Sequence, residues 1–413
     1  MAWEVKKLAD IKSITFMRGN GLNKSVLDDN GTKKCILYGD LYTKYAHPII
    51  KKIVNRTNFE GKVKSKKGDV LIPGTTTADA FGIAIARSIN EDGIFLGGDI
   101  NILRTNNEEL LSDFLSYYIN GPAKWELASY ATGTNIMHLS NKKIQNIEVP
   151  IPPLPIQKKI VEILDSAFER IAKAKENSEQ NLKNAKEVFE SYLQKVFENK
   201  GKDWEEKEIQ EFSKNKDAIV SGPFGSNLKV EHYKESGIPI VRLQNIGKGY
   251  FIDKDIKYIS NEKAEELKYH SFKSGDLILA KLGIPVGKTC KVPDTFPKGI
   301  IVADVVRLRL DPKIISYDFL LFYLNTNLAV SQLTKNISGA TRPRVNLSNV
   351  REIKISYPKS LEEQKEIVSK LDNLSEQTKQ LESIYSQKLS CLEELKQSIL
   401  QKAFKGELTE VSS

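Results

Sequence analysis

Several Gly-rich loops in the first 150 residues carry cationic, amide, hydroxyl and aromatic side chains. The set comprises Arg18, Asn23, Lys24, Tyr38, Tyr42, Lys44, Thr75 and Thr76. Side chains of these types contact phosphates, sugars and base edges in nucleic-acid interfaces. We therefore expect these loops to form a nucleic-acid-binding surface. For each tyrosine, packing in the core is the alternative, because tyrosine is intermediate in burial.

The second half of the chain carries a different set in loops at equivalent places. This set comprises Ser226, Asn227, Lys229, Arg242, Gln244, Asn245, Lys248, Arg342 and Arg344. The forked groups of Arg242, Gln244 and Asn245 match guanine or adenine edges in the major groove. Lys24, Lys229 and Lys248 are better suited to phosphates. Two alternatives stay open: Gln244 and Asn245 as turn caps, and Arg242 as the partner of a carboxylate.

No catalytic motif is evident in the sequence. The segment 151–154, Ile-Pro-Pro-Leu, lacks the polar acceptor and the aromatic ring of an adenine methyltransferase loop. Residues 283–289 resemble a phosphate loop but have three residues between the glycines where the Walker pattern needs four. The three cysteines and four histidines are scattered, which argues against a zinc site or a disulfide framework. We expect a non-catalytic chain without metal, although a triad assembled in space stays open.

The charge pattern is compatible with a polyanionic partner. The net charge is +9, divided as +4 over residues 1–150, zero over 151–199, +7 over 200–358 and −2 over 359–413. A basic surface attracts phosphates, but a modest excess also serves solubility alone. The sequence has no apolar run of 18 residues and no signal-peptide pattern at its start, so we expect a cytoplasmic protein.

Two long helices must position these loops. Apolar residues recur at spacings of three and four, which is typical of a coiled-coil seam. The predicted seam holds Ile160, Leu164, Ala167 and Ile171 in the first helix and Ile367, Leu371, Leu374, Leu381, Leu392, Leu395 and Ile399 in the second. The second helix matches the first at an offset of 207 residues without a gap, and both ends carry identical residues.

The same offset relates the globular parts, since Lys67 to Ile72 matches Ser274 to Leu279. The sequence predicts a duplicated α/β (α+β) fold with mixed sheets. We expect globular domains at 1–150 and 200–358, helices at 151–199 and 359–406, and a tail at 407–413. A pseudo two-fold axis would make the helices antiparallel and hold the domains roughly 60 Å apart along the helix axis.

The sequence resembles the specificity subunit of Type I restriction-modification systems over essentially its full length. The resemblance lies in the Gly-Pro-Phe-Gly-Ser loop at 222–226, the segments 240–247 and 338–347, the Pro-rich entries followed by Gln157 or Gln364, and the Leu-Gln-Lys-x-Phe helix ends. The first domain matches the family pattern only loosely.

The resemblance implies two target recognition domains that each read half of a split double-stranded DNA site. It implies that the helices are spacers that dock two methyltransferase (modification) subunits, with restriction endonuclease subunits as further partners. No cofactor is then expected in this chain, and S-adenosylmethionine, ATP and Mg belong to the partners. The alternatives are an architectural adaptor with non-specific DNA binding, and the specificity subunit of a system with a fused nuclease and methylase.

Overall fold

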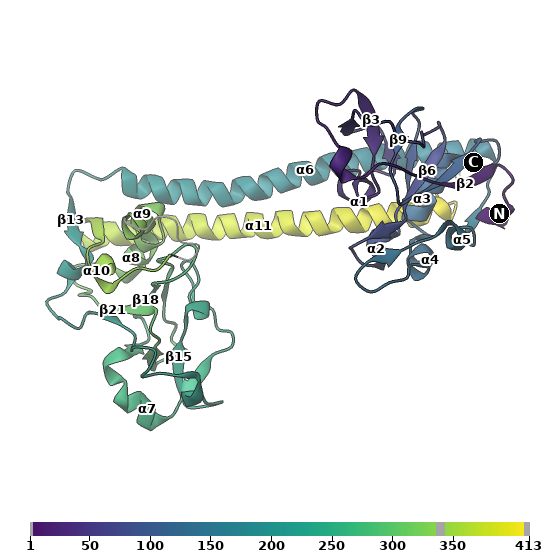
Figure 1. Cartoon of the computed structure of the whole chain (residues 1–413). Coiled ribbons are helices and arrows are strands. Elements are labelled where there is room, and N and C mark those ends of the chain that lie inside the picture. The colour runs from purple at the N-terminus through teal and green to yellow at the C-terminus, as the bar shows by residue number, and fades with distance from the viewer. Residues whose placement is uncertain (1–2, 336–342, 409–413) are drawn as a thin grey trace. The chain divides into compact units, whose positions relative to one another are not determined.

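The computed structural model describes residues 3–335 and 343–408. The chain divides into two compact units, residues 1–180 with 386–413 and residues 181–385. Each unit contains one globular domain and a part of each of two long helices, α6 (Leu154–Glu198) and α11 (Leu361–Phe404) (Figure 1).

A five-stranded mixed sheet forms the centre of the first domain. Its order is β2 (Ile14–Arg18), β10 (Ile100–Thr105), β6 (Asp69–Pro73), β8 (Arg87–Ile89) and β4 (Ile49–Ile50). Neighbouring strands are antiparallel, except that β8 and β4 are parallel. Alternate side chains of β6 enter two cores: Val70 and Ile72 pack towards the helices, and Leu71 packs on the opposite side. This two-sided burial explains why β6 is apolar throughout.

Smaller elements complete the first domain. They are the sheet β5 (Asn55–Thr57), β3 (Lys33–Ile36) and β9 (Phe95–Leu96), the ribbon of β1 (Val5–Lys7) with β12 (Glu148–Pro150), the ribbon of β7 (Thr75–Thr76) with β11 (Met137–His138), and the helices α1 (Asp40–Thr43), α2 (Ala80–Ile83), α3 (Ser112–Asn120), α4 (Lys124–Ser129) and α5 (Asn141–Ile144). Helix α3 buries Phe114, Leu115 and Tyr117 in the core that also contains the start of α6.

The second domain repeats this plan. One sheet has the order β14 (Ile219–Ser221), β21 (Val305–Leu308), β18 (Leu277–Ala280) and β19 (Thr289–Lys291), and the other β16 (Lys257–Ile259), β15 (Ile238–Val241), β20 (Lys298–Ile301) and β17 (Ser271–Lys273). The ribbon is β13 (Trp204–Glu208) with β22 (Lys354–Pro358), and the helices are α7 (Asn261–Glu266), α8 (Tyr317–Leu324), α9 (Asn327–Thr334) and α10 (Leu347–Arg351). Strands β15 and β20 are parallel in an otherwise antiparallel set, so the predicted mixed sheets are confirmed.

The two long helices run antiparallel, as predicted. In the first unit, Leu400 near the end of α11 shares a core with Ile160 and Leu164 near the start of α6. In the second unit, Leu371 near the start of α11 shares a core with Phe197 at the end of α6. The start of one helix therefore meets the end of the other in both units.

The predicted seam is only partly correct. Ile160, Leu164, Ile171 and Leu371 are buried, and Ala167, Ile367, Leu374, Leu392 and Ile399 are half-buried. Leu381 and Leu395 are wrongly placed, because they are 42% and 46% exposed. A straight helix drifts by about 20° per heptad from a strict 3.5-residue repeat, so a seam extrapolated from one end leaves the contact line.

A repeated glutamine joins each long helix to its domain. Gln157 is fully buried; its Oε1 accepts the backbone N–H of Leu111 at 2.8 Å, and its Nε2 donates to the carbonyls of Glu109 and Pro152. Gln364, at the same place in α11, makes three corresponding bonds in the second unit. The two identical residues thus satisfy the same buried backbone groups in both halves.

The chain closes on itself within the first unit. Trp3 and Phe404 pack against the same core, and a Cβ on Gly406 would lie 3.5 Å from the ring of Trp3. In the second unit, the rings of Phe197 and Trp204 lie 6.5 Å apart. The chain end after Phe404 therefore lies close to Trp3, as Trp204 lies close to Phe197.

Candidate DNA interface

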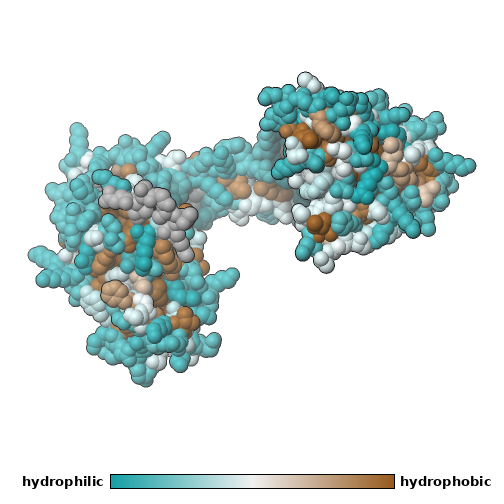
Figure 2. Space-filling model, viewed as in Figure 1, coloured by the Kyte–Doolittle hydropathy of each residue, from teal (hydrophilic) through white to brown (hydrophobic). Residues whose placement is uncertain are grey.

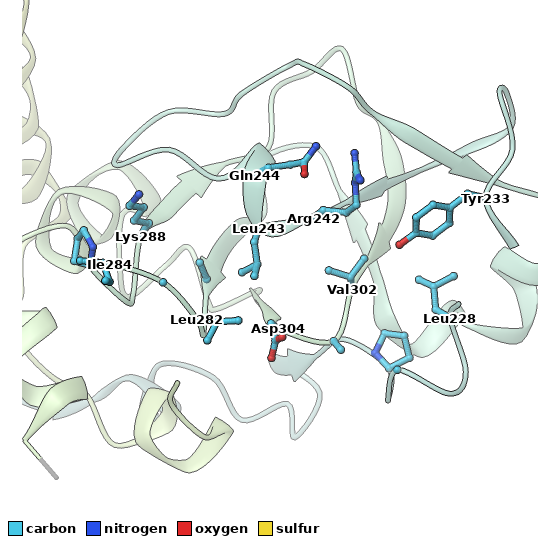
Figure 3. A pocket seen from close by; sticks show the side chains of 16 residues that line it. Leu228, Tyr233, Arg242, Leu243, Gln244, Leu282, Ile284, Lys288, Val302 and Asp304 are labelled. Atoms are coloured by element: carbon cyan, nitrogen blue, oxygen red, sulfur yellow. The ribbon is translucent and has the colours of Figure 1, made fainter. Parts of the chain in front are cut away.

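A cavity of about 740 Å³ opens on the second domain. Five segments line it: 223–228, Tyr233, 242–244, 280–288 and 302–304. Figure 3 shows Lys288 and Ile284 on one side, Tyr233 and Leu228 on the other, and Arg242 and Gln244 along the third. In Figure 2 the visible face of this unit carries apolar residues framed by hydrophilic ones. The cavity thus combines an apolar floor with hydrogen-bonding groups at its rim.

The predicted base-reading residues Arg242 and Gln244 share one carboxylate. Arg242 Nη2 and Gln244 Nε2 both donate to Asp255 Oδ2 at 3.0 Å. Hydrogen bonds from Lys257 and then from Arg242 and Gln244 hold the pKa of Asp255 well below its usual range. The ionised carboxylate therefore orients both side chains before any ligand arrives. The structure therefore supports the alternative interpretation, in which Arg242 pairs with a carboxylate.

Asn245 is not a surface residue. It is fully buried, its Oδ1 accepts the N–H of Arg242 at 3.0 Å, and its Nδ2 donates to the carbonyls of Ile252 and Lys254. The prediction that it reads a base is wrong for this conformation. Its role is the alternative that the sequence left open, a turn cap.

The basic residues of this domain differ in whether they form ion pairs. Lys248 forms an ion pair at 2.8 Å with Glu190 of α6, Lys229 lies 3.6 Å from Glu231, and Arg344 lies 2.5 Å from Asp304. Arg342 lies outside the described residues. Of the two cations that line the cavity, Arg242 is paired with Asp255 and Lys288 has no ion pair within the described ranges, so Lys288 is the lining cation more available to a phosphate.

The remaining predicted positions of the second set lie on an exposed turn. Ser226 and Asn227 are exposed, and the Ser226 hydroxyl donates to Asn227 Oδ1 at 3.3 Å. Sequence reasoning did not single out Phe224 and Tyr233, which belong to the loop and the wall of the same cavity region. The signal that could have revealed Phe224 is an aromatic residue flanked by glycine and proline in a loop.

In the first domain the predicted residues are partly committed to local structure. Arg18 pairs with Asp99 at 2.5 Å, Asn23 caps a short turn by accepting the N–H of Ser25, and Lys24 is exposed. Lys44 donates to Asn55 and lies 3.5 Å from Asp40.

Tyr38 and Tyr42 are half-buried against the core, with ring centroids 6.4 Å apart. Burial, followed by the charges of Tyr42 and Asp99, raises the pKa of Tyr38. Each of these two tyrosines therefore packs partly against the core and remains partly exposed to solvent.

Thr75 and Thr76 are misplaced in the predicted DNA-binding set. Both are buried, at 8% and 1% exposure, in β7, which pairs with His138 and Met137 of β11. The Thr76 hydroxyl accepts the backbone N–H of Ala78 at 3.0 Å. The strand partner lies more than 60 residues away, so the local sequence does not reveal this burial.

Within the described part of the chain, no group of three or more His, Cys, Asp or Glu side chains could hold a metal ion. No helix in those residues is long and apolar enough to cross a membrane. Burial raises the pKa of the thiol of Cys35 to about 11 and of Cys290 to about 12, which makes both inert at neutral pH.

The fold and the site together define a duplicated DNA-recognition protein: two domains of one plan, with different loops, each joined to an antiparallel helix pair. The model of the Type I restriction modification DNA specificity domain matches residues 2–184 and again 201–389. The chain therefore belongs to the family of Type I restriction-modification DNA specificity subunits and carries two target recognition domains.

Known proteins agree with this assignment. The MjaVIII specificity subunit of Methanocaldococcus jannaschii is 26% identical over 392 residues, covering 91% of this chain and 87% of that protein. The EcoBI specificity subunit of Escherichia coli is 26% identical over 302 residues, covering 67% and 62%. The solved HsdS subunit of Thermoanaerobacter tengcongensis has a TM-score of 0.56 at 19% identity, covering 96% and 97%. A chain of a solved type I R-M system has a TM-score of 0.69 at 19% identity, covering 95% and 98%. The two structural likenesses bear on the fold alone.

Proposed function

We propose that each domain reads one half of a split DNA site, and that the helices set the unread gap between the halves. The observation that carries this proposal is the cavity of the second domain. There Asp255 pre-orients Arg242 and Gln244, and Lys288 offers an unpaired cation beside them. Pre-oriented forked groups discriminate base edges, and a nearby cation positions the domain on a phosphate.

The first domain keeps the same frame with different side chains in its loops, so we infer that it reads a different half-site. Arg18, Lys24 and Lys44 are its exposed cations in the predicted set. Arg18 is oriented by one hydrogen bond to Asp99, whereas Arg242 is less exposed and makes two bonds to Asp255. Unequal loops on one scaffold support an asymmetric site.

We further propose that the helix pair docks two methyltransferase subunits. In the first unit, an apolar groove is lined by Ile163, Ala167, Ile171, Leu395 and Ile399. Exposed apolar side chains along a helix pair fit the apolar stripe of a partner helix. Docking of a partner helix in this groove would explain why Leu395 is 46% exposed although leucine side chains are usually buried.

We place the chemistry on the partner chains. In this proposal the modification subunits bind S-adenosylmethionine and methylate adenine, and the restriction subunits use ATP and Mg. The present chain contributes recognition and spacing.

A loop exchange tests the reading role. Residues 219–247 of the full chain, co-expressed with its modification subunits, are replaced by those of a relative, and methylated positions in the host genome are mapped. We expect only one half of the site to change, while the other half and the gap stay the same. Exchange of residues 18–45 is the matched control and should change the opposite half. Changes in both halves, or in neither, would contradict the proposal.

A charge substitution tests the docking role. We expect Leu395→Glu to weaken association with the modification subunits, because it places a charge in an apolar groove. Gln397→Glu, on an exposed position of the same helix, is the control of equal charge. Equal association of both variants would exclude this groove as a docking surface.

The runner-up function is an architectural adaptor that binds DNA without sequence preference. Salt separates the two functions, because counterion release weakens all binding while base contacts keep their preference. We expect the chain to retain a large preference for its mapped site over a shuffled duplex as salt rises.

A further inference from the structure

The tip of the loop at 222–227 carries an aromatic side chain with almost no protein contact. Phe224 is 85% exposed, the highest value among the large apolar side chains of the described residues. Contact of a bare phenyl ring with water is unfavourable relative to burial. A ring in this position is suited to a partner that covers it.

The loop that carries Phe224 is held in place by its backbone. The N–H of Gly222 donates to the carbonyl of Val305 at 2.9 Å, and the N–H of Asn227 donates to the carbonyl of Phe224 at 2.9 Å. A Cβ on Gly222 would lie 1.9 Å from the Val302 oxygen, so only glycine permits this approach. The ring is therefore projected by a turn anchored at its base.

The surroundings of the loop favour a nucleic acid over an apolar protein surface. Pro223 and Gly225, on either side of Phe224, line the cavity that also holds Arg242, Gln244 and Lys288. Among the charged residues that line the cavity, Arg242 is paired with Asp255 and Asp304 with Arg344, while Lys288 forms no ion pair within the described residues. Cations and forked donors around a flat ring match phosphates, base edges and a base stack together.

The duplicated half provides an internal comparison. Gly19 occupies the place of Gly222: its N–H donates to Ile100 at the start of β10, and a Cβ there would lie 2.0 Å from the Gly97 oxygen. The residues that follow are Asn20, Gly21 and the buried Leu22. The anchored glycine is thus common to both halves, and the projected ring is an addition in the second.

We propose that Phe224 is an aromatic wedge that inserts at one base step of the half-site read by the second domain. This inference rests on the proposed function and adds a DNA deformation to it. Apolar side chains inserted at a base step unstack it and bend the duplex, which also makes the sequence of that step part of the recognition. The equivalent loop of the first domain carries no aromatic ring after Gly19, so we expect this loop to deform only the half-site read by the second domain.

Fluorescence of 2-aminopurine tests the wedge, since this base brightens when it is unstacked. The full chain, assembled with its modification subunits, is titrated with duplexes of the mapped site that carry 2-aminopurine at successive adenine positions other than the methylated adenine, which a methyltransferase itself extrudes. We expect a several-fold rise at one step of the second half-site. Phe224→Ala should abolish that rise and weaken binding roughly tenfold, in line with the loss of one base–aromatic contact. Phe224→Leu should keep part of both, because leucine also wedges.

Val230→Ala is the matched control, because Val230 is 77% exposed and follows the same loop. It should leave both the fluorescence rise and the affinity unchanged. An unchanged fluorescence rise in Phe224→Ala would overturn the wedge. If that variant still prefers its mapped site, the proposed function holds. Loss of modification-subunit association in Phe224→Ala, with DNA distortion retained, also overturns the wedge and assigns the ring to a protein contact. If the unsubstituted complex shows no preference for its mapped site, both proposals fail.

Discussion

Replacement of Gln364 by methionine should loosen the second recognition domain from its helix. Methionine is unbranched and similar in size, so the change removes hydrogen bonds with little loss of packing. Three backbone groups lose their partner: the N–H of Ser316 at 2.7 Å, and the carbonyls of Pro358 at 2.9 Å and Ile314 at 3.1 Å. An unsatisfied buried group costs about 1–3 kcal/mol, and the bonds to Ser316 and Ile314 are only part-buried, so we expect a total of about 3 kcal/mol.

Tryptophan fluorescence during urea unfolding provides the assay. Trp204 lies in the second unit, where its ring N–H donates to Glu363 at 3.0 Å, next to Gln364. A background with Trp3→Phe and Trp125→Phe therefore leaves a single reporter of this unit. With a denaturant slope of about 2–3 kcal/mol per molar, Gln364→Met should lower the unfolding midpoint by roughly 1 M.

Two further variants decide whether the reasoning holds. Gln377→Met changes an exposed glutamine of the same helix and should change the free energy of unfolding by less than about 0.5 kcal/mol. Gln157→Met in the first unit, followed by circular dichroism in the otherwise unsubstituted chain, should cost about as much as Gln364→Met, because its three bonds are the same. A shift for Gln364→Met as small as that of Gln377→Met would refute the account of this buried glutamine as the joint between helix and domain.

Three other outcomes are expected. Burial lowers the pKa of His47 although Asp165 lies nearby. The unfolded chain therefore binds the proton more tightly than the folded chain, and the stability of the fold should fall as the pH drops from about 7 towards 5. His47→Phe should reduce that pH-dependent loss of stability, as measured by thermal melts. Deletion of residues 175–181 together with 382–388 removes one heptad from each helix and shortens each helix by about 10 Å. The unread DNA gap in the methylation map should then shorten by about three base pairs. An unchanged gap would contradict the spacer role. A permutant that joins residue 413 to residue 1 and opens near 201 should fold and keep its methylation pattern, because Trp3 and the end of α11 already share one core.

Much of the architecture could be predicted because it follows from sequence patterns that occur twice in the chain. The 207-residue offset predicted two domains of one plan and two equivalent helices, and the helix starts matched because Gln157 and Gln364 meet the same backbone need. Apolar runs such as 70–72 predicted buried strands, since only a strand covered on both faces is apolar at every position. These features depend on local periodicity and composition, which a chain carries before it folds.

The assignment of single residues to the site required the tertiary structure. Asn245 and Thr76 are polar and sit in Gly-rich segments, yet both are buried: Asn245 bonds to the turn that follows it, at residues 252 and 254, and Thr76 pairs with a strand more than 60 residues away. Leu395 follows the heptad pattern, yet it faces outward because the helix pair leaves the extrapolated seam. In each case the outcome depends on contacts that form only in the folded chain, which the residue type and the local pattern do not reveal.

The sequence by itself determined the family, the duplication and the residue types available to read DNA. Only the tertiary structure decided which of them face a ligand: Asp255 holds Arg242 and Gln244 at a cavity rim, and the close approach of Gly222 to Val302 projects Phe224. The physical reason is that the availability of a side chain depends on what its neighbours in space have already satisfied, and those neighbours are set by packing.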